Sequence, residues 1–540
     1  MYGFIPDPKG FSVLTPSPSA VQTPGRPLRQ GVVLFITCLA LATVMAAMAS
    51  LNVALPDIAR QTHATQTQQS WIVDAYSLVF ASLLLPAGAL GDRFGRRRAL
   101  VAGLIVFGAG SALAEFTTGP DQLIALRAVL GVGAALIMPA TLSTITSSFP
   151  REQRARAVSI WSAVAGASGV LGLLASGTLL EWWSWQSVFR FNVLLAVIAL
   201  VGTLAFVPES ADSRPAPLDA IGAILAAAGI AALVYAVIEA PVNGWSDPVT
   251  LGGIAVGLLV LVGFVLFELR SRHPLLDPRL FTDRRFAAGS LSITLQFFAL
   301  FGFIFVVMQY LQLVRGDSAL MAALSLLAMP VGMVPASRLS PGLTQRFGDR
   351  GPWVAGLLAL AAGLGVLAHL DGGSSYWHIA AGLIPLGAGL GLAMPPATTS
   401  ITSAVPQGLQ NVGSAVNDLA RELGGALGIA VLGSILTAGY RNNLHLTGVA
   451  PQVAEAAKSS LAGAAAAGPE VMHQAQDAFI TGLRDSLHGG AVTAVVTAIA
   501  VGVLLRRRRT ASSGTPCPAP AEPVPHSGPE QADAAWPYAG

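Results

Sequence analysis

Three ionisable residues stand within one apolar run near the carboxyl-terminal end of the chain. Asp418, Arg421 and Glu422 are three and four residues apart, so a helix would place them on one stripe. Two acids with one base leave a net carboxylate, which could load and release a proton or attract a cationic substrate. The alternative is an internal ion pair that only stabilises helix packing.

Two further ionisable residues lie in apolar runs of the amino-terminal half. Arg127 is followed one helical turn later by Gly131, which gives a helix face with one cation and little bulk. Asp74 stands beside Trp71 and Tyr76 and could be a protonatable carboxylate on which Arg127 acts. The plainer interpretations are that Arg127 pairs with a carboxylate only to fix packing, and that Asp74 is a hydrated residue near the outer surface.

The composition indicates that lipid surrounds these residues. Of the 540 residues, 53% are hydrophobic and 11% are charged, whereas roughly a quarter are charged in a soluble domain. A mean hydropathy of +0.63 leaves too few polar side chains for the surface of a soluble fold. Nucleic-acid binding is not expected, because the net charge of +3 is small and the arginines stand in short clusters beside apolar runs.

Runs of about twenty apolar residues predict an all-α integral membrane protein with fourteen transmembrane helices. The predicted spans are 31–55, 70–90, 99–117, 120–142, 157–180, 189–207, 218–239, 249–268, 287–310, 318–338, 353–370, 377–398, 412–438 and 489–505. An even number of spans places both termini on one side of the membrane. Arginine clusters in alternate loops predict that this side is the cytoplasm.

Two similar loops indicate an internal repeat. Arg93-Phe94-Gly95 follows the second predicted span, and Arg346-Phe347-Gly348 follows the tenth. The repeat predicts two six-helix halves, two helices inserted between them and a substrate cavity between the halves. The predicted domains are a disordered cytoplasmic N-terminus at 1–30, the first half at 31–209, the inserted helices and a cytoplasmic linker at 210–286, the second half at 287–505 and a disordered cytoplasmic tail at 506–540. Within the second half, an extracytoplasmic loop at 440–487 could hold a short amphipathic helix.

The loop after the second span could latch a gate. It holds two glycines, one aspartate and three arginines, namely Gly88, Gly95, Asp92, Arg93, Arg96 and Arg97. The glycines permit a tight turn and close helix approach, and the arginines offer fixed donors to carboxylates or helix C-termini. The alternative is that the arginines only set topology, but topology needs no aspartate, so Asp92 favours the latch.

This loop, Gly88-Ala89-Leu90-Gly91-Asp92-Arg93-Phe94-Gly95-Arg96-Arg97, resembles the signature loop of the major facilitator superfamily. Supporting segments are Asn52-Val53-Ala54-Leu55-Pro56, Trp71-Ile72-Val73-Asp74-Ala75-Tyr76, His273-Pro274-Leu275-Leu276 with Leu280-Phe281, and Arg421-Glu422-Leu423-Gly424-Gly425-Ala426-Leu427-Gly428. Within the superfamily, residues 30–440 resemble the fourteen-helix drug:proton antiporters. The resemblance implies a monomer in the cell membrane that exports amphipathic drugs or antibiotics in exchange for protons, without a metal or cofactor.

The resemblance also assigns roles to individual residues. Arg127 resembles the arginine of the family's fourth-helix motif, which is tied to proton transfer, although Leu130 replaces the usual glutamine. Close helix packing is expected at glycines of predicted spans four, five and thirteen, namely Gly131, Gly172, Gly177, Gly424, Gly425 and Gly428.

Three departures from the family pattern affect elements linked to coupling and direction. Ala47 replaces an aspartate of the first helix, the fifth-helix segment Gly172-Leu173-Leu174-Ala175-Ser176-Gly177 lacks a proline, and Gln186 replaces an arginine. They keep two alternatives open: an importer or uniporter of a metabolite on the same fold, and a transport-dead membrane sensor. An enzyme is not expected, because no phosphate-binding loop, metal-ligand cluster or nucleophile with a matched base is present.

Overall fold

The structure is a computed structural model that describes residues 27–210, 219–271, 274, 276–404, 410–446, 449–465 and 468–505. These residues form helices and no strand. The first eight helices are α1 (Pro27–Thr62), α2 (Gln66–Phe94), α3 (Arg96–Ala114), α4 (Pro120–Ser148), α5 (Arg151–Trp182), α6 (Gln186–Phe206), α7 (Ala220–Asn243) and α8 (Pro248–Glu268). The others are η1 (Pro278–Thr282), α9 (Arg284–Gln309), η2 (Tyr310–Val314), α10 (Ala319–Ser325), α11 (Ala328–Phe347), α12 (Arg350–Leu367), α13 (Tyr376–Ala404), α14 (Gln410–Asn443), α15 (Pro451–Ser459), α16 (Leu461–Ala465) and α17 (Pro469–Leu504).

Twelve segments of the described chain are long and apolar enough to cross a membrane. Helices are the expected form there, because hydrocarbon offers no partner for an unpaired backbone N–H or C=O. The helices α2 and α5 are 29 and 32 residues long but are not among the twelve. The all-helical membrane fold is therefore confirmed, and the count of fourteen spans stays a prediction.

Local sequence signals account for how several helices begin. The Thr65 hydroxyl accepts a hydrogen bond from the Gln68 backbone N–H, and the Gln68 side chain accepts one from the Thr65 backbone, both at 3.1 Å. These two bonds satisfy donors that the start of α2 would otherwise leave free. Asp247 and Asp283 cap α8 and α9 with a carboxylate.

The helices before and after the inserted pair repeat one set of contacts. In the first half, α4 packs against α1, α2 and α3, α5 packs against α1, and α6 packs against α1 and α3. In the second half, α13 packs against α9, α11 and α12, α14 packs against α9, and α17 packs against α9 and α12. This correspondence favours two repeats, while the domain boundaries at 209 and 286 stay predictions.

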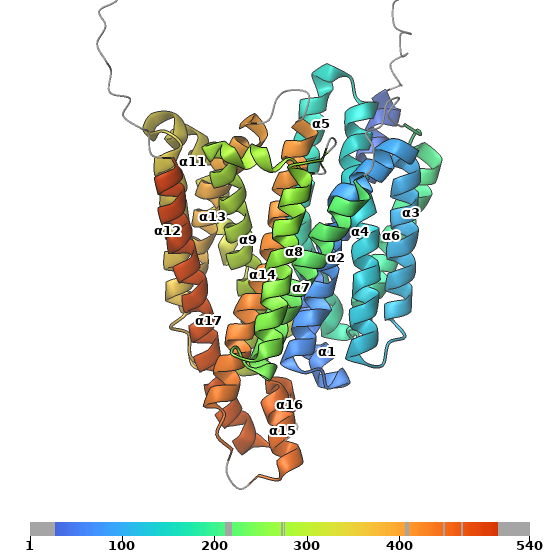
Figure 1. The fold of residues 1–540 in the computed structure, drawn as a ribbon. Coiled ribbons are helices and arrows are strands. Elements are labelled where there is room, and N and C mark those ends of the chain that lie inside the picture. Colours follow the sequence, from blue (N-terminus) through green and yellow to red (C-terminus); the bar gives the residue numbers. More distant parts are fainter. Residues whose placement is uncertain are drawn as a thin grey trace, which may run out of the picture. The chain divides into compact units, whose positions relative to one another are not determined.

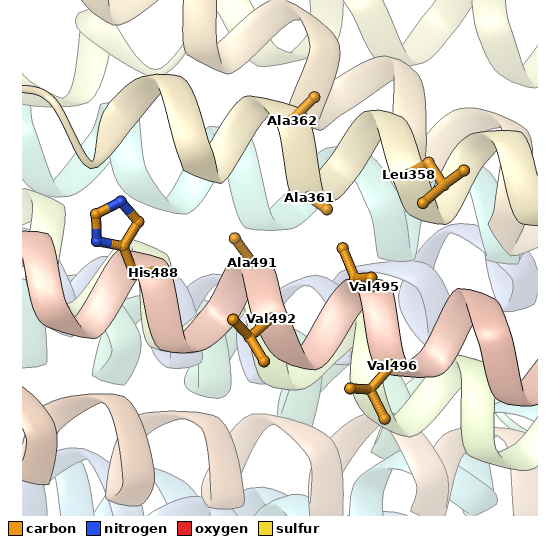
Figure 2. Close-up of a pocket in the computed structure, with 8 residues that line it drawn as sticks. All are labelled: Leu358, Ala361, Ala362, His488, Ala491, Val492, Val495 and Val496. Carbon is orange, nitrogen blue, oxygen red and sulfur yellow. The ribbon is translucent and has the colours of Figure 1, made fainter.

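The two halves meet along two seams. The helix α2 packs against α14, and α5 packs against α10. The inserted helix α7 packs against α8, α2 and α14, so it lies along the α2–α14 seam (Figure 1). An apolar groove lies between α12 and α17, both in the second half (Figure 2).

The structure corrects the predicted loop at 440–487. The helix α14 runs to Asn443 and α17 begins at Pro469, so the connection between them is shorter and itself contains α15 and α16. The search for apolar runs missed the start of α17, because Glu470, His473 and Asp477 interrupt the run there. The tenth predicted span is also interrupted, between α10 and α11, although the whole segment is long enough to span. The predicted disordered ends lie outside the described residues, except that α1 begins at Pro27.

Candidate functional site

The turn between α2 and α3 is clamped to the end of α6. Gly95 has a φ of +114°, a conformation that favours glycine, and its N–H donates to the Gly91 carbonyl at 3.0 Å. The Glu209 carboxylate accepts a hydrogen bond from the Arg97 backbone at 3.2 Å and lies 3.6 Å from Nε of Arg98. A Cβ at residue 95 would lie 2.5 Å from Oε1 of Glu209. Glycine is therefore required both by the backbone and by the close carboxylate.

The clamp has further bonds to the same segment. The Arg97 guanidinium donates to the Leu204 carbonyl at 2.6 Å, and the Arg96 backbone N–H donates to the Ser210 carbonyl at 2.8 Å. The side chain of Asp92, on which the predicted latch depends, lies outside the described residues, so that latch stays a prediction. Sequence reasoning missed Glu209. Its only signal was that it directly follows the sixth apolar run, on the side of the membrane where the arginine cluster of the α2–α3 turn is predicted.

We expect Glu209→Gln to slow transport by roughly fivefold, because an amide cannot balance the neighbouring arginines and holds the turn less well. Initial efflux rates in membrane vesicles would measure the loss. The matched control is Glu115→Gln, which removes another partly exposed acid that pairs with Arg190 at 3.0 Å. Equal rates for the two variants would contradict a role for the clamp.

The corresponding turn in the second half has similar geometry. Gly348 also has a positive φ, of +75°. The Arg346 guanidinium lies 5.4 Å from the Phe347 ring centre, and that of Arg93 lies 5.7 Å from the Phe94 ring centre. The shared Arg-Phe-Gly sequence therefore has a shared local structure, which supports the internal repeat.

Arg127 is a buried cation on α4 that contacts α2. The residue is 1% exposed, and its Nε donates to the Ile72 carbonyl at 2.9 Å. Its guanidinium lies 4.3 Å from the centre of the Tyr76 ring, a cation–π distance. Within the described residues its partners are thus a carbonyl and an aromatic ring, and no ion pair to a carboxylate is present.

Asp74 is a buried acid on α2. It is fully buried, which disagrees with the interpretation as a hydrated surface residue. Neither carboxylate oxygen has a hydrogen-bond partner among the described residues. An ionised carboxylate without a partner is costly in such a place.

The acids and base of α14 share one region but differ in their partners. Nη1 of Arg421 lies 3.9 Å from Oδ1 of Asp418, and its guanidinium lies 4.6 Å from the Phe297 ring centre on α9. Glu422 is 5% exposed, and its Oε2 has no hydrogen-bond partner in the described part of the chain. Arg421 therefore pairs with Asp418. Glu422 is a second acid on α14, and it is buried.

Tyr76 of α2 contacts both Arg127 of α4 and the first helix, α1. Its hydroxyl donates to the Val44 carbonyl of α1 at 3.3 Å. Asp74, Arg127 and Glu422 thus lie on three helices of which α2 packs against both α4 and α14.

The inserted helix α7 is bonded to both helices of the α2–α14 seam. The Trp71 indole N–H donates to Oε1 of Glu239 at 3.1 Å, and the Ser434 hydroxyl donates to the Val237 carbonyl at 2.6 Å. The Trp71 and Tyr235 rings are 5.8 Å apart. Sequence reasoning missed Glu239, although it is an acid in the seventh apolar run.

Several predicted packing glycines lie at close helix contacts. A Cβ at Gly131 would lie 2.6 Å from the Tyr76 carbonyl, and one at Gly172 would lie 2.7 Å from Cα of Ala46. A Cβ at Gly177, on the other seam, would lie 2.9 Å from Cα of Leu320. On α14, Gly424, Gly425 and Gly428 face Thr294, Phe301 and Phe298 of α9. By contrast, a Cβ at Gly88 would meet Pro139 at an ordinary 3.5 Å.

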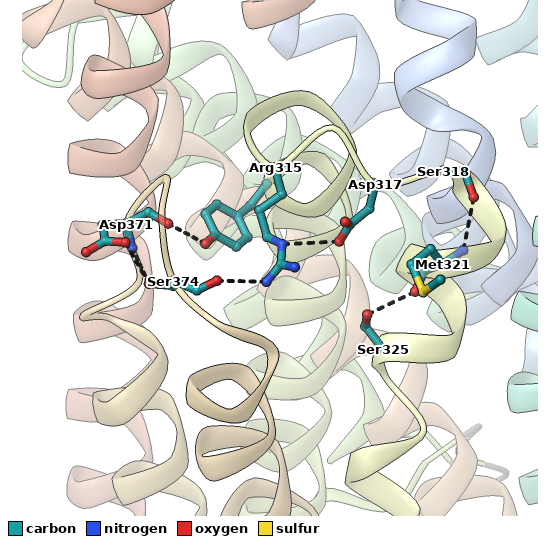
Figure 3. Close-up of polar contacts among 8 residues, drawn as sticks. Arg315, Asp317, Ser318, Met321, Ser325, Asp371 and Ser374 are labelled. Carbon is teal, nitrogen blue, oxygen red and sulfur yellow. Dashed lines mark hydrogen bonds and ion pairs between the residues drawn. The ribbon is translucent and has the colours of Figure 1, made fainter.

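A polar network ties η2 and the residues after it to the turn between α12 and α13 (Figure 3). The Arg315 guanidinium lies 3.3 Å from the Asp317 carboxylate and donates to the Ser374 carbonyl at 2.9 Å. The Tyr310 hydroxyl donates to the Asp371 carbonyl at 2.6 Å. Hydrogen bonds from the Ser374 hydroxyl and the backbone N–H of Gly373 lower the pKa of Asp371.

The comparisons with known proteins agree with this architecture. The family model of the Major Facilitator Superfamily matches residues 37–429. The multidrug efflux pump LfrA of Mycolicibacterium smegmatis is 35% identical over 501 residues, which cover 91% of this chain and 99% of LfrA. The tetracenomycin C resistance and export protein of Streptomyces glaucescens is 33% identical over 78% of this chain and 79% of its own length.

A solved structure has the same fold. A bacterial homolog of the human lysosomal transporter Spinster, in an inward-facing and unoccupied conformation, matches with a TM-score of 0.61 at 19% identity. The match covers 89% of this chain and 98% of that structure. The sequence and fold matches agree, and the chain belongs to the Major Facilitator Superfamily and, within it, to the multidrug efflux proteins.

Proposed function

We propose that this chain exports small amphipathic organic molecules, cationic drugs or antibiotics among them, in exchange for protons. The relatives are named as efflux, resistance and export proteins, which favours export over uptake of a metabolite and over a transport-dead sensor. The observation that carries proton exchange is the pair of buried acids, Asp74 and Glu422, on helices of different halves that pack against each other.

The proposed exchange follows from the cost of an ionised acid in hydrocarbon. An ionised Asp74 or Glu422 is tolerated when water or a cationic substrate reaches it, and a bound proton removes that need. Proton binding on one side would thus release the substrate, and proton loss on the other would prepare the acids for the next one. The membrane potential supplies about 2.3 kcal/mol per proton for each 100 mV.

The proposed orientation places the α2–α3 turn and both termini in the cytoplasm of a monomer in the cell membrane. Arginines concentrate at that turn, as the positive-inside rule requires. Large exposed indoles lie at the ends of helices on the opposite side, where membrane interfaces favour them. They are Trp182, Trp183, Trp245 and Trp377.

Reconstitution into liposomes with an imposed pH gradient tests the proposed exchange. A cationic dye should accumulate in the direction opposite to proton flow, and a protonophore should abolish the accumulation. Accumulation in the same direction as the protons would contradict antiport. Dye movement that does not depend on the pH gradient would instead indicate a uniporter.

A further inference from the structure

The groove between α12 and α17 is apolar along most of its length (Figure 2). It has a volume of about 430 Å³, and its lining includes His488, Ala491, Val492, Val495 and Val496 of α17. Both helices are among the segments that can cross the membrane, and Val492 and Val496 are 61% and 57% exposed. Bilayer hydrocarbon therefore covers this surface.

One end of the groove is basic. Arg484 precedes His488 by four residues on α17, so a helix places both on one face, and both are exposed. Ala491 and Val495 continue this face at the next turns, towards the middle of the span. The exposed ring of His369, just beyond α12, lies 5.9 Å from that of His488. A basic end thus leads directly into the apolar groove.

The acids near this end have other neighbours. The Asp371 carboxylate accepts hydrogen bonds from Gly373 and from Ser374, both at 2.9 Å. The Asp485 carboxylate lies towards Gly439 of α14, where an added Cβ would lie 3.4 Å from it. No acid is among the groove's lining residues. Among the described residues, no ion pair joins Arg484, His488 or His369 to an acid.

We propose that this groove binds one anionic phospholipid of the leaflet at the α15 end, with an acyl chain along the valines and the phosphate at Arg484, His488 and His369. Basic residues beside an apolar cleft between transmembrane helices match the charge and shape of such a lipid. The lining residues of the groove include none of the acids of α2 and α14, so the site does not rest on the proposed exchange.

Native mass spectrometry of the full-length purified protein tests the phosphate contact. Samples would be equilibrated in mixed micelles of detergent with phosphatidylglycerol or with phosphatidylcholine. The parent should retain phosphatidylglycerol preferentially, and the double variant Arg484→Gln with His488→Gln should lose that preference by at least about fivefold. Lys458→Gln, which removes a cation of the α15 segment, is the control and should retain it. Equal retention of the two lipids by the parent, or an unchanged preference in the double variant, would overturn the proposal.

A second variant tests the acyl-chain contact. Val495→Trp should fill the groove and reduce retention of both lipids severalfold, while Val262→Trp on the exposed face of α8 should not. Equal retention by these two variants would overturn the groove as the binding site. All the substituted residues are partly or largely exposed, so size-exclusion profiles and dye flux should match the parent. A failure of proton exchange alone would leave the lipid result unchanged.

Discussion

Replacing Asp74 by Asn or Glu422 by Gln is expected to reduce pH-driven dye accumulation by at least about tenfold. Both changes keep the size and shape of the side chain but remove the group that could carry a proton. Dye should still equilibrate down its own gradient, because the amides leave the helix packing intact. Accumulation and equilibration would be followed in the same liposomes, with and without an imposed pH gradient.

The matched control for these variants is Asp121→Asn. Asp121 lies in the first turn of α4, is exposed and accepts a hydrogen bond from the Gln68 side chain at 3.0 Å. Its loss should leave pH-driven accumulation unchanged. If the Asp74 and Glu422 variants accumulate dye as fast as the Asp121 variant, neither acid carries the coupled proton.

Arg127→Lys is expected to lower the transport rate by roughly thirtyfold although the charge is kept. A compact ammonium cannot reproduce both the Nε bond to Ile72 and the planar contact with the Tyr76 ring. A desolvated cation–π contact alone is worth about 2 kcal/mol, which corresponds to roughly that factor in rate. Initial rates of dye efflux in vesicles measure the loss.

The control for Arg127 is Arg190→Lys on the exposed Arg190–Glu115 pair. That substitution should change the rate by less than about twofold, because an exposed pair contributes little. Thermal unfolding of both variants separates a transport defect from loss of the fold. A folded Arg127→Lys variant with the parental rate would show that the guanidinium geometry is not needed.

The composition and apolar runs were sufficient to predict the helical membrane fold and the ionisable residues within it. Hydrocarbon requires every spanning segment to be apolar and to satisfy its own backbone hydrogen bonds. Each span can therefore be recognised from its own residues. Arg127 and Asp74 are both buried, whereas the sequence alone left a hydrated Asp74 as an alternative. The partners of Arg127 could not be predicted, because a carbonyl such as that of Ile72 and a ring such as that of Tyr76 leave no spacing signal.

Contacts between distant segments were the main features that sequence reasoning missed. Glu209 and Glu239 each bond to a residue more than a hundred positions away, Arg97 and Trp71 respectively. The residues of each pair are too far apart in sequence for a helical or strand periodicity to reveal their contact. The polar first part of α17 was missed for a different reason, since hydropathy detects a span only where the helix enters hydrocarbon.

The two hydrogen bonds that α7 makes, to Trp71 of α2 and Ser434 of α14, make the two seams unequal. In the proposed exchange, a rocking of the halves would make α7 follow one of these helices and part from the other, or slide with both. In either case α7 stands between the lipid and the α2–α14 seam. Among the described helices, the α5–α10 seam has no such cover. A molecule dissolved in the bilayer would therefore be separated from the α2–α14 seam by α7. At the α5–α10 seam, no inserted helix would stand in its way.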